Sequence, residues 1–148
     1  PSHLVIGIDQ PAARLAAVLE GRRPLPPNAV VVRAEVAAFW RLAREARWCF
    51  DRLYLLYPNP WPKPAHLMRR WHAHPGFADA LAIAATLELR TNWQVYADEM
   101  QRALSIAGTN AVAERWQAPD PAAEDAVTTP FETKYAASGH ALWRVVAR

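Results

Sequence analysis

Short apolar segments rich in β-branched residues alternate with helical segments along this chain, and that alternation restricts its fold more than any other feature. The apolar segments read "HLVIGI" (3–8), "AVVVRAEV" (29–36), "CFDRLYLLY" (49–57) and "TLELR" (86–90). Helical patterns follow them at 11–21, 36–47, 65–83 and 91–108. Strands that alternate with helices are typical of an α/β fold built on an open, mostly parallel sheet.

Glycine and proline mark the ends of the helical segments. Gly21 and Gly108 end the first and the fourth, because glycine readily takes the left-handed conformation that closes a helix. Thr91 or Asn92 is the expected N-cap of the fourth segment. The dipeptide 75–76, Pro-Gly, interrupts the third.

Two further strand segments, "NAVAERWQ" (110–117) and "GHALWRVVAR" (139–148), come late in the chain. A loop rich in proline and alanine (118–130) separates them. A late strand pair with a long connection predicts an antiparallel edge on the sheet.

The composition predicts one domain over residues 1–148, since 52% of the residues are hydrophobic and 21% are charged. The net charge of +3 is only a weak indication of an anionic partner. A single cysteine, Cys49, excludes an internal disulfide, and the scattered histidines predict no metal site. No apolar run approaches the roughly 18 residues of a membrane span. We therefore expect a soluble, monomeric, cytoplasmic protein.

Ligands of open α/β sheets bind beyond the carboxyl ends of the strands, and several polar residues fall there. Asp9 and Glu35 follow the first two strand segments, Asn59 the third, and Thr91 and Asn92 the fourth. A carboxylate such as Asp9 can accept both hydroxyls of a ribose, but a helix cap or a solvated charge is an equally good explanation. The argument for Glu35 is weaker still. No glycine-rich phosphate-binding motif occurs among the five glycines.

The third strand segment ends in the loop "YPNPWPKPAHLMRR" (57–70). Asn59 lies between two prolines that restrict the backbone, so its amide is held in one direction and suits a planar heterocycle. Trp61 offers a face on which a base can stack. The alternative is a turn that merely ends an interior strand, with the tryptophan in the core.

Basic residues follow in the same loop. Lys63 precedes a helical segment in which His66, Arg69 and Arg70 are spaced i, i+3 and i+4, which predicts one helical face near its N-terminus. Cations at a helix start suit phosphate groups. A solvated charged face is the alternative, but the adjoining tryptophan loop favours a phosphate site.

Three motifs in this order resemble the tRNA (guanine-N7-)-methyltransferases. They are "YLLYPNPWPKPAHLMRRW" (54–71), "LELRTNWQVYADEM" (87–100) and "TPFETKYAASGHALWRV" (129–145). The resemblance implies a Rossmann-like methyltransferase fold, S-adenosyl-L-methionine as the methyl donor, and a guanine of tRNA as the target.

The resemblance also implies roles for single residues. Asn59 would lie beside cofactor and guanine as the catalytic position. The cofactor would contact Asp9 and Asn59, and Glu35 joins them as a cofactor-binding candidate because of its position after the second strand segment. The tRNA and its target base would contact Trp61, Lys63, His66, Arg69, Arg70, Thr91, Asn92, Thr129 and Glu132.

The chain departs from the family pattern in three places. The glycine-rich first strand of the family would lie before Pro1, so we expect one strand of the sheet to be missing. Asn59 and Asn92 stand where the family has aspartate, and Ala84-Ala85 stands where it has two glycines. The chain is then either a fragment of a longer enzyme or a divergent relative.

Three functions remain open from the sequence. The first is methyl transfer to guanine N7, which needs no general base because this nitrogen has a free lone pair. The second is RNA binding by a degenerate relative that has lost the cofactor pocket. The third is methyl transfer to an exocyclic amine, which "NPW" at 59–61 permits but the "TPFE" element at 129–132 disfavours.

Overall fold

The structure is a computed structural model that describes residues 3–119 and 129–148. Its strands are β1 (Val5–Asp9), β2 (Ala29–Arg33), β3 (Leu53–Leu56), β4 (Leu87–Thr91), β5 (Ala111–Trp116) and β6 (Leu142–Ala147). Its α-helices are α1 (Ala12–Leu19), α2 (Val36–Glu45), α3 (Phe77–Ala82), α4 (Gln94–Ile106) and α5 (Pro130–Ala137). Two 3₁₀ segments, η1 (Pro64–Arg69) and η2 (Trp71–Ala73), lie between β3 and α3. None of the described helices is long and apolar enough to cross a membrane.

The larger sheet has four strands in the order β3-β4-β6-β5. β3 and β4 are parallel, whereas β6 is antiparallel to both of its neighbours, β4 and β5. The expected α/β fold with an antiparallel edge is therefore confirmed. The edge consists of the β6–β5 pair, with β5 outermost.

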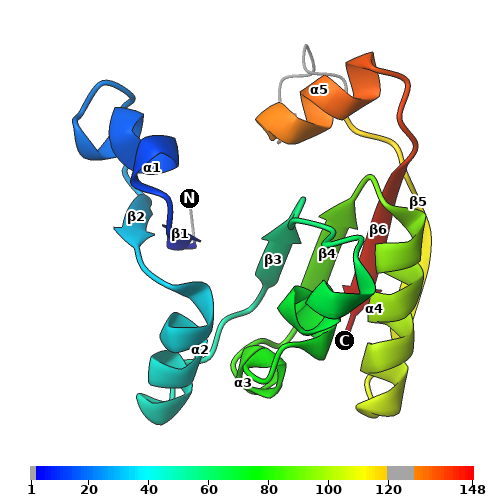
Figure 1. Cartoon of the computed structure of the whole chain (residues 1–148). Helices are drawn as coiled ribbons and strands as arrows, with labels where there is room; N and C mark the ends of the chain where they lie inside the picture. The colour runs from blue at the N-terminus through cyan, green and yellow to red at the C-terminus, as the bar shows by residue number, and fades with distance from the viewer. Residues whose placement is uncertain (1–2, 120–128) are drawn as a thin grey trace.

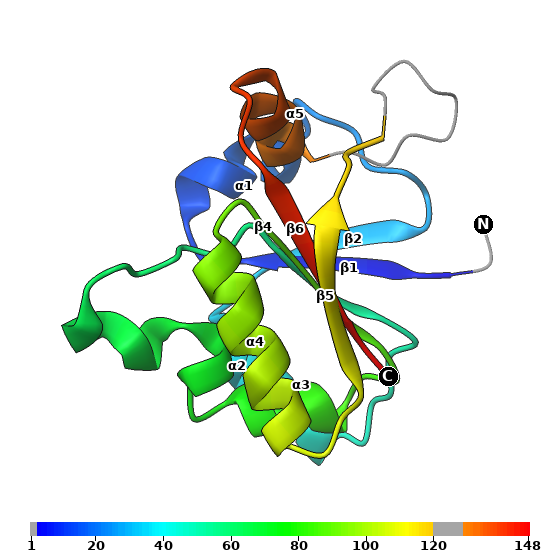
Figure 2. The ribbon, with the colours of Figure 1, turned by 90° about the vertical axis from the view of Figure 1, so that its right-hand side faces the viewer.

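One face of this sheet forms the core. Leu55, Leu89 and Val145 lie opposite one another on neighbouring strands, and all three are buried. Alternate residues of a strand point to opposite faces, so these three side chains share one face of the sheet. Against them pack Tyr96, Met100 and other buried residues of α4, which recur at helical spacing. Figures 1 and 2 show α4 lying over this face of the sheet, with α3 beside it.

β1 and β2 form a separate parallel pair. We expected a single sheet, and the structure corrects this, because no strand of the described residues lies between β1 and β3 to hydrogen-bond with both. Figure 1 shows the pair standing apart from β3, and Figure 2 shows it running steeply across the direction of β5 and β6. The connection runs through α2, which packs against α3 and buries Trp40 against Trp71.

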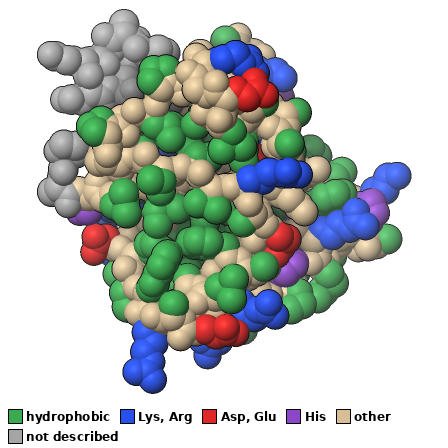
Figure 3. Space-filling model, turned by 90° about the vertical axis from the view of Figure 1, so that its left-hand side faces the viewer, with side chains coloured by type: hydrophobic (Ala, Val, Ile, Leu, Met, Phe, Trp, Pro, Cys, Tyr) green, Lys and Arg blue, Asp and Glu red, His purple; other side chains and the backbone are tan. Residues whose placement is uncertain are grey.

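The β1–β2 pair is poorly covered. Val30 and Val32 of β2 remain 44% and 38% exposed, and Val5 of β1 is 54% exposed. Figure 3 shows apolar side chains gathered in the middle of the face on the side of α1, β2 and α2. The helix that packs against this pair is α1, which contacts β2.

Three local predictions need correction. The segment 65–83 is mainly two 3₁₀ segments and a short helix, because its hydrogen bonds at 63–70 run from residue i to i+3. α4 begins at Gln94 and its N-cap is Trp93, not Thr91 or Asn92 as expected. The Thr91 hydroxyl instead accepts a hydrogen bond from the Trp93 N–H at 3.1 Å, ahead of the helix. α5 was not predicted. The loop expected at 118–130 falls largely on residues 120–128, outside the described part of the chain.

We expect the β1–β2 pair to open more readily than the larger sheet. Each of its strands has one strand partner, whereas β4 and β6 each have two and their central residues Leu89 and Val145 are fully buried. Amide hydrogen exchange of this 148-residue chain should therefore be at least about tenfold faster in β1 and β2 than in β4 and β6. Equal protection of the four strands would show instead that the whole chain opens as one unit.

Candidate functional site

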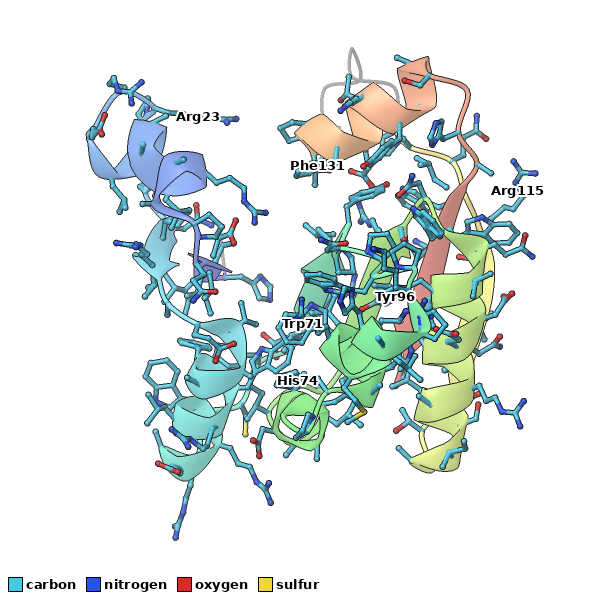
Figure 4. The ribbon with its side chains drawn as sticks, in the orientation of Figure 1. Arg23, Trp71, His74, Tyr96, Arg115 and Phe131 are labelled. Atoms are coloured by element: carbon cyan, nitrogen blue, oxygen red, sulfur yellow. The ribbon has the colours of Figure 1, made fainter. Side chains whose placement is uncertain are left out.

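The predicted site residues fall into two groups in space. One end of the larger sheet carries the loop after β3, the end of β4 with Thr91 and Asn92, and the start of α5. The Tyr57 N–H donates to the Arg90 carbonyl at 2.8 Å, so the first two are joined directly. Figure 4 shows Phe131 of α5 above the ends of β3 and β4. Asp9 and Glu35 belong to the β1–β2 side of the molecule.

Glu132 is the centre of the site on the α5 side and is fully buried. Its Oε1 accepts hydrogen bonds from Arg90 Nη1 at 2.9 Å and from Trp116 Nε1 at 3.0 Å, while Oε2 accepts one from the Thr129 N–H at 2.8 Å. A buried carboxylate is costly unless it is paired and hydrogen-bonded, and here it is both. Glu132 therefore joins α5 to β4 and β5.

The same residues explain why α5 forms. The Thr129 hydroxyl accepts from the Glu132 N–H at 3.1 Å, which completes a capping box with Pro130 at the first helical position. This pattern, T-P-F-E, was visible in the sequence as a helix start. Neither the helix nor the burial of Glu132 was predicted from it, because the pattern was interpreted only as part of the family resemblance.

An aromatic cluster lies beside Glu132. Tyr57 packs its ring on Phe131 and Tyr135, with ring centroids 6.3 and 5.7 Å apart, and its hydroxyl is buried. Burial, with the negative charge of Glu132 added, raises the pKa of Tyr57 far above its usual range, so the phenol stays protonated. Tyr135 in turn stacks on His140, whose Nδ1 lies 3.2 Å from Asn92 Nδ2.

The loop after β3 presents Asn59 to solvent. The side chain is exposed, and its Oδ1 accepts a hydrogen bond from the Trp61 N–H at 3.2 Å, so the amide oxygen is used and the Nδ2 donor is not part of this bond. Arg69 lies over the Trp61 ring, with its guanidinium carbon 4.7 Å from the ring centroid, and His66 meets the ring edge-on at 5.3 Å. The predicted grouping of Trp61 with basic residues is therefore present, and Lys63 is exposed next to it.

Arg70 does not share the face of His66 and Arg69. The 3₁₀ helix η1 has about three residues per turn, so His66 and Arg69 align, whereas Arg70 follows the helix in an extended conformation. Arg70 is only 9% exposed, donates to the Trp61 carbonyl and pairs with Glu99 of α4. Its charge is used inside the protein.

Asp9 and Glu35 both have local partners. Asp9 Oδ1 accepts from the Gln10 N–H at 2.9 Å, and Oδ2 lies 3.3 Å from Arg14 Nη1. Glu35 caps α2, because its two oxygens accept from the N–H groups of Ala37 and Ala38 at 3.0 and 2.6 Å. The capping explanation left open for such carboxylates therefore describes Glu35 in this structure.

Several site residues were not found from the sequence, namely Tyr57, Arg90, Trp116, His140 and Glu99. Arg90 had a signal, since Glu88 and Arg90 interrupt the apolar strand "LELR" on one face and pair at 2.8 Å. The others required knowledge of which strands are neighbours. Among the described residues no cluster of three His, Cys, Asp or Glu side chains is arranged to hold a metal ion.

Comparison with known proteins agrees with this fold. A family model described as "Putative methyltransferase" matches residues 1–145. A solved antibiotic-related methyltransferase superposes with a TM-score of 0.63 at 17% identity, covering 98% of this chain and 75% of that one. SMU.776, described as "a putative methyltransferase complexed with SAH", superposes with a TM-score of 0.55 at 13% identity, covering 98% of this chain and 39% of that one. At such low identity these structures confirm the Rossmann-like fold alone.

Curated relatives carry the name that the sequence motifs suggested. The tRNA (guanine-N(7)-)-methyltransferase of Pseudomonas savastanoi pv. phaseolicola is 30% identical over 151 positions, covering 97% of this chain and 60% of that protein. The protein of the same name from Pseudomonas paraeruginosa is 34% identical over 101 positions, covering 63% and 39%. The chain thus spans about two to three fifths of the length of these relatives. Because the family model described above matches residues 1–145, the chain belongs to the methyltransferase family that this model represents.

Proposed function

We propose that this chain belongs to a cytoplasmic, monomeric enzyme that transfers a methyl group from S-adenosyl-L-methionine to N7 of a guanine in tRNA. The observation that carries the proposal is the position of the Asn59–Trp61 loop, which lies with its basic residues at the same sheet end as Glu132 and Asn92. The names of the curated relatives and the SAH bound to one structural neighbour support it.

The chemistry asks mainly for orientation. Guanine N7 carries an in-plane lone pair and no proton, so no general base is needed, and the bound cofactor would supply an electrophilic methyl group. The protein must hold acceptor and donor in line, which can account for a large part of the rate. Asn59 suits this task, since its Oδ1 is tied to the loop and its Nδ2 remains free for an acceptor such as guanine O6.

Asp9 has the donor chemistry for the ribose of the cofactor. Its carboxylate lies at the carboxyl end of β1 and remains 32% exposed. It can accept further hydrogen bonds beside the one from Gln10 and the ion pair with Arg14. Glu35 offers less, because both of its oxygens already cap α2.

The outward basic residues would meet the tRNA backbone. Lys63 and Arg69 are exposed, and His66 lies with Arg69 against Trp61. Such cations neutralise phosphates and release counterions, which makes binding depend on salt. Arg70 is not included in this surface, since it is buried.

We predict that replacing Lys63 and Arg69 with alanine weakens tRNA binding and lowers its salt dependence by up to about two units of slope, one for each phosphate contact. The measurement is tRNA affinity of the complete gene product across a salt series. A matched control is the Arg22→Ala, Arg23→Ala double variant, which removes the same charge from an exposed loop on the α1 side. An equal loss in both variants would mean that only net charge matters.

We predict that the 148-residue chain alone binds S-adenosyl-L-methionine more weakly than about 1 µM, which corresponds to about −8 kcal/mol. Asp9 ends β1 and Asn59 follows β3, and these strands belong to separate sheets. No strand pairing among the described residues therefore holds the two side chains at one distance. Calorimetry measures this directly. Micromolar binding that is lost on Asp9→Ala would contradict the prediction.

We predict that Asn59→Asp raises methyl transfer and leaves tRNA binding nearly unchanged. A carboxylate would face the positive charge of the methylated base, and one such contact contributes at most roughly 2.7–4 kcal/mol, or about 100- to 1000-fold. The assay is transfer of labelled methyl to unmodified tRNA by the complete gene product at saturating cofactor. Asn110→Asp, which makes the same change just before β5, is the control.

Equal activity of Asn59→Asp and wild type would show that position 59 acts without electrostatic effect. Absence of transfer by either protein, with tRNA binding retained, would refute the proposed function and favour a degenerate RNA-binding relative.

A further inference from the structure

Trp61 has a backbone conformation that both its side chain and the proline after it disfavour. Its φ is +44°, in the left-handed region that is unfavourable for a residue with a side chain. Pro62 follows it, and a proline restricts the residue before it to extended conformations. Contacts from elsewhere in the fold must therefore hold this peptide in place.

Arg70 provides such contacts. Its Nε and Nη2 both donate to the Trp61 carbonyl, at 3.3 and 3.1 Å, so one edge of the guanidinium grips a single oxygen. Arg70 is 9% exposed, and nothing in its position offers the charge to solvent. Lysine could not reproduce this contact, because an ammonium lacks the planar pair of donors.

Glu99 of α4 holds Arg70 from the other side. Arg70 Nη1 donates to Glu99 Oε2, and His72 Nε2 lies 3.1 Å from the same oxygen. Burial lowers the pKa of His72, so the neutral imidazole leaves Arg70 as the countercharge of Glu99. His72 packs edge-on against the ring of Tyr96, which is buried, so the Glu99 carboxylate is anchored to the core.

The Trp61 residue connects this anchor to Asn59. Its carbonyl is held by Arg70, and its N–H donates to Asn59 Oδ1 at 3.2 Å. Rotation of the Trp61 backbone toward an ordinary conformation would move that N–H and release the Asn59 amide. The contacts thus form one continuous chain from α4 to the side chain that we propose faces the guanine.

We propose that Glu99 and Arg70 are positioning residues, a clamp that sets the direction of the Asn59 amide through the strained Trp61 peptide. Neither residue touches tRNA or cofactor. The inference rests on the proposed function for its consequence in catalysis, but the clamp itself is a statement about the geometry of Asn59. In this role Arg70 replaces a phosphate contact that the sequence spacing had predicted for it.

The first test measures the Asn59 side-chain amide by ¹H–¹⁵N NMR of the complete gene product. Arg70→Lys keeps the charge beside Glu99 but loses the double contact to Trp61, so the Asn59 NH₂ signals should shift while those of Asn28 and Asn110 stay in place. Glu99→Gln should shift them in the same direction. The control is Arg44→Lys, which alters another ion pair between elements, Arg44–Asp79 at 2.7 Å.

The second test measures methyl transfer in a double-mutant cycle with Asn59→Ala. Arg70→Lys should lower kcat about 10- to 100-fold, since a misplacement of about 1 Å can cost that much, and should leave KM for tRNA within about twofold. In the Asn59→Ala background the same change should cost less than about twofold, because the clamp acts through Asn59. Arg44→Lys should leave kcat unchanged.

Unshifted Asn59 signals in the Arg70→Lys variant, or losses in kcat that add in full in the double variant, would overturn the clamp. If Arg70→Lys does not fold, Glu99→Gln decides by the same two readouts. A wild-type protein that transfers no methyl group would refute the proposed function, and the NMR result would still decide whether the clamp positions Asn59.

Discussion

The burial of Glu132 organises the end of the sheet at which the candidate site lies. A carboxylate without exposure needs compensation, and three elements supply it through Arg90 of β4, Trp116 of β5 and the backbone of Thr129. Removing one partner from a buried pair typically costs 3–5 kcal/mol, because the other charge stays buried. α5 is therefore held against the sheet by a polar contact in addition to the packing of Phe131 and Tyr135 on Tyr57, and its capping box depends on the same side chain, Glu132.

The contacts of Glu132 continue across the sheet through Arg90. Arg90 bonds Glu88 as well as Glu132, and its guanidinium lies over Trp116, with Arg144 over the same ring at 4.4 Å. Tyr54 of β3 lies 5.8 Å from Arg90 on the other side. Cations and aromatic rings thus alternate across neighbouring strands on the face opposite α4. Each charged side chain on this face therefore has an oppositely charged or aromatic neighbour that holds it in one position.

The loop that carries Asn59 lies between two polar anchors, the Glu132–Arg90 pair and the Glu99–Arg70 pair, and its backbone is strained. Of the residues with a side chain and positive φ in the described part of the chain, Tyr57 at +50° and Trp61 at +44° bracket Asn59, and the third is Arg47. Strained backbone persists only where the surroundings hold it, and such places are often functional. Here Tyr57 is held by the α5 aromatic cluster and Trp61 by Arg70, so Asn59 lies between two restrained positions.

Much of the fold could be predicted from the sequence, whereas the contacts between the residues of the site could not. The strand–helix alternation predicted the elements, and Gly21 and Gly108, at φ of +71° and +80°, end helices where expected. The direction of Arg70 was predicted wrongly because spacing alone cannot distinguish three residues per turn from 3.6. The roles of Trp116, Glu99 and Arg90 depend on strand order and on packing between distant segments, which periodicity does not encode.

The two anchors also bear on why an asparagine can stand at position 59. Glu132 is neutralised by Arg90, and Glu99 by Arg70, so neither carboxylate presents a free negative charge to a bound base. Asn59 and Asn92 are neutral as well. Among the described residues at this sheet end, a cationic methylated guanine would therefore meet dipoles and aromatic faces rather than an unpaired anion. Under the proposed function, such a site would forgo part of the electrostatic stabilisation of the transition state, and for the same reason it would hold the charged product less tightly. Methyl transfer here would then depend chiefly on how firmly the loop orients the base, which is the property that the strained peptides and their buried partners supply.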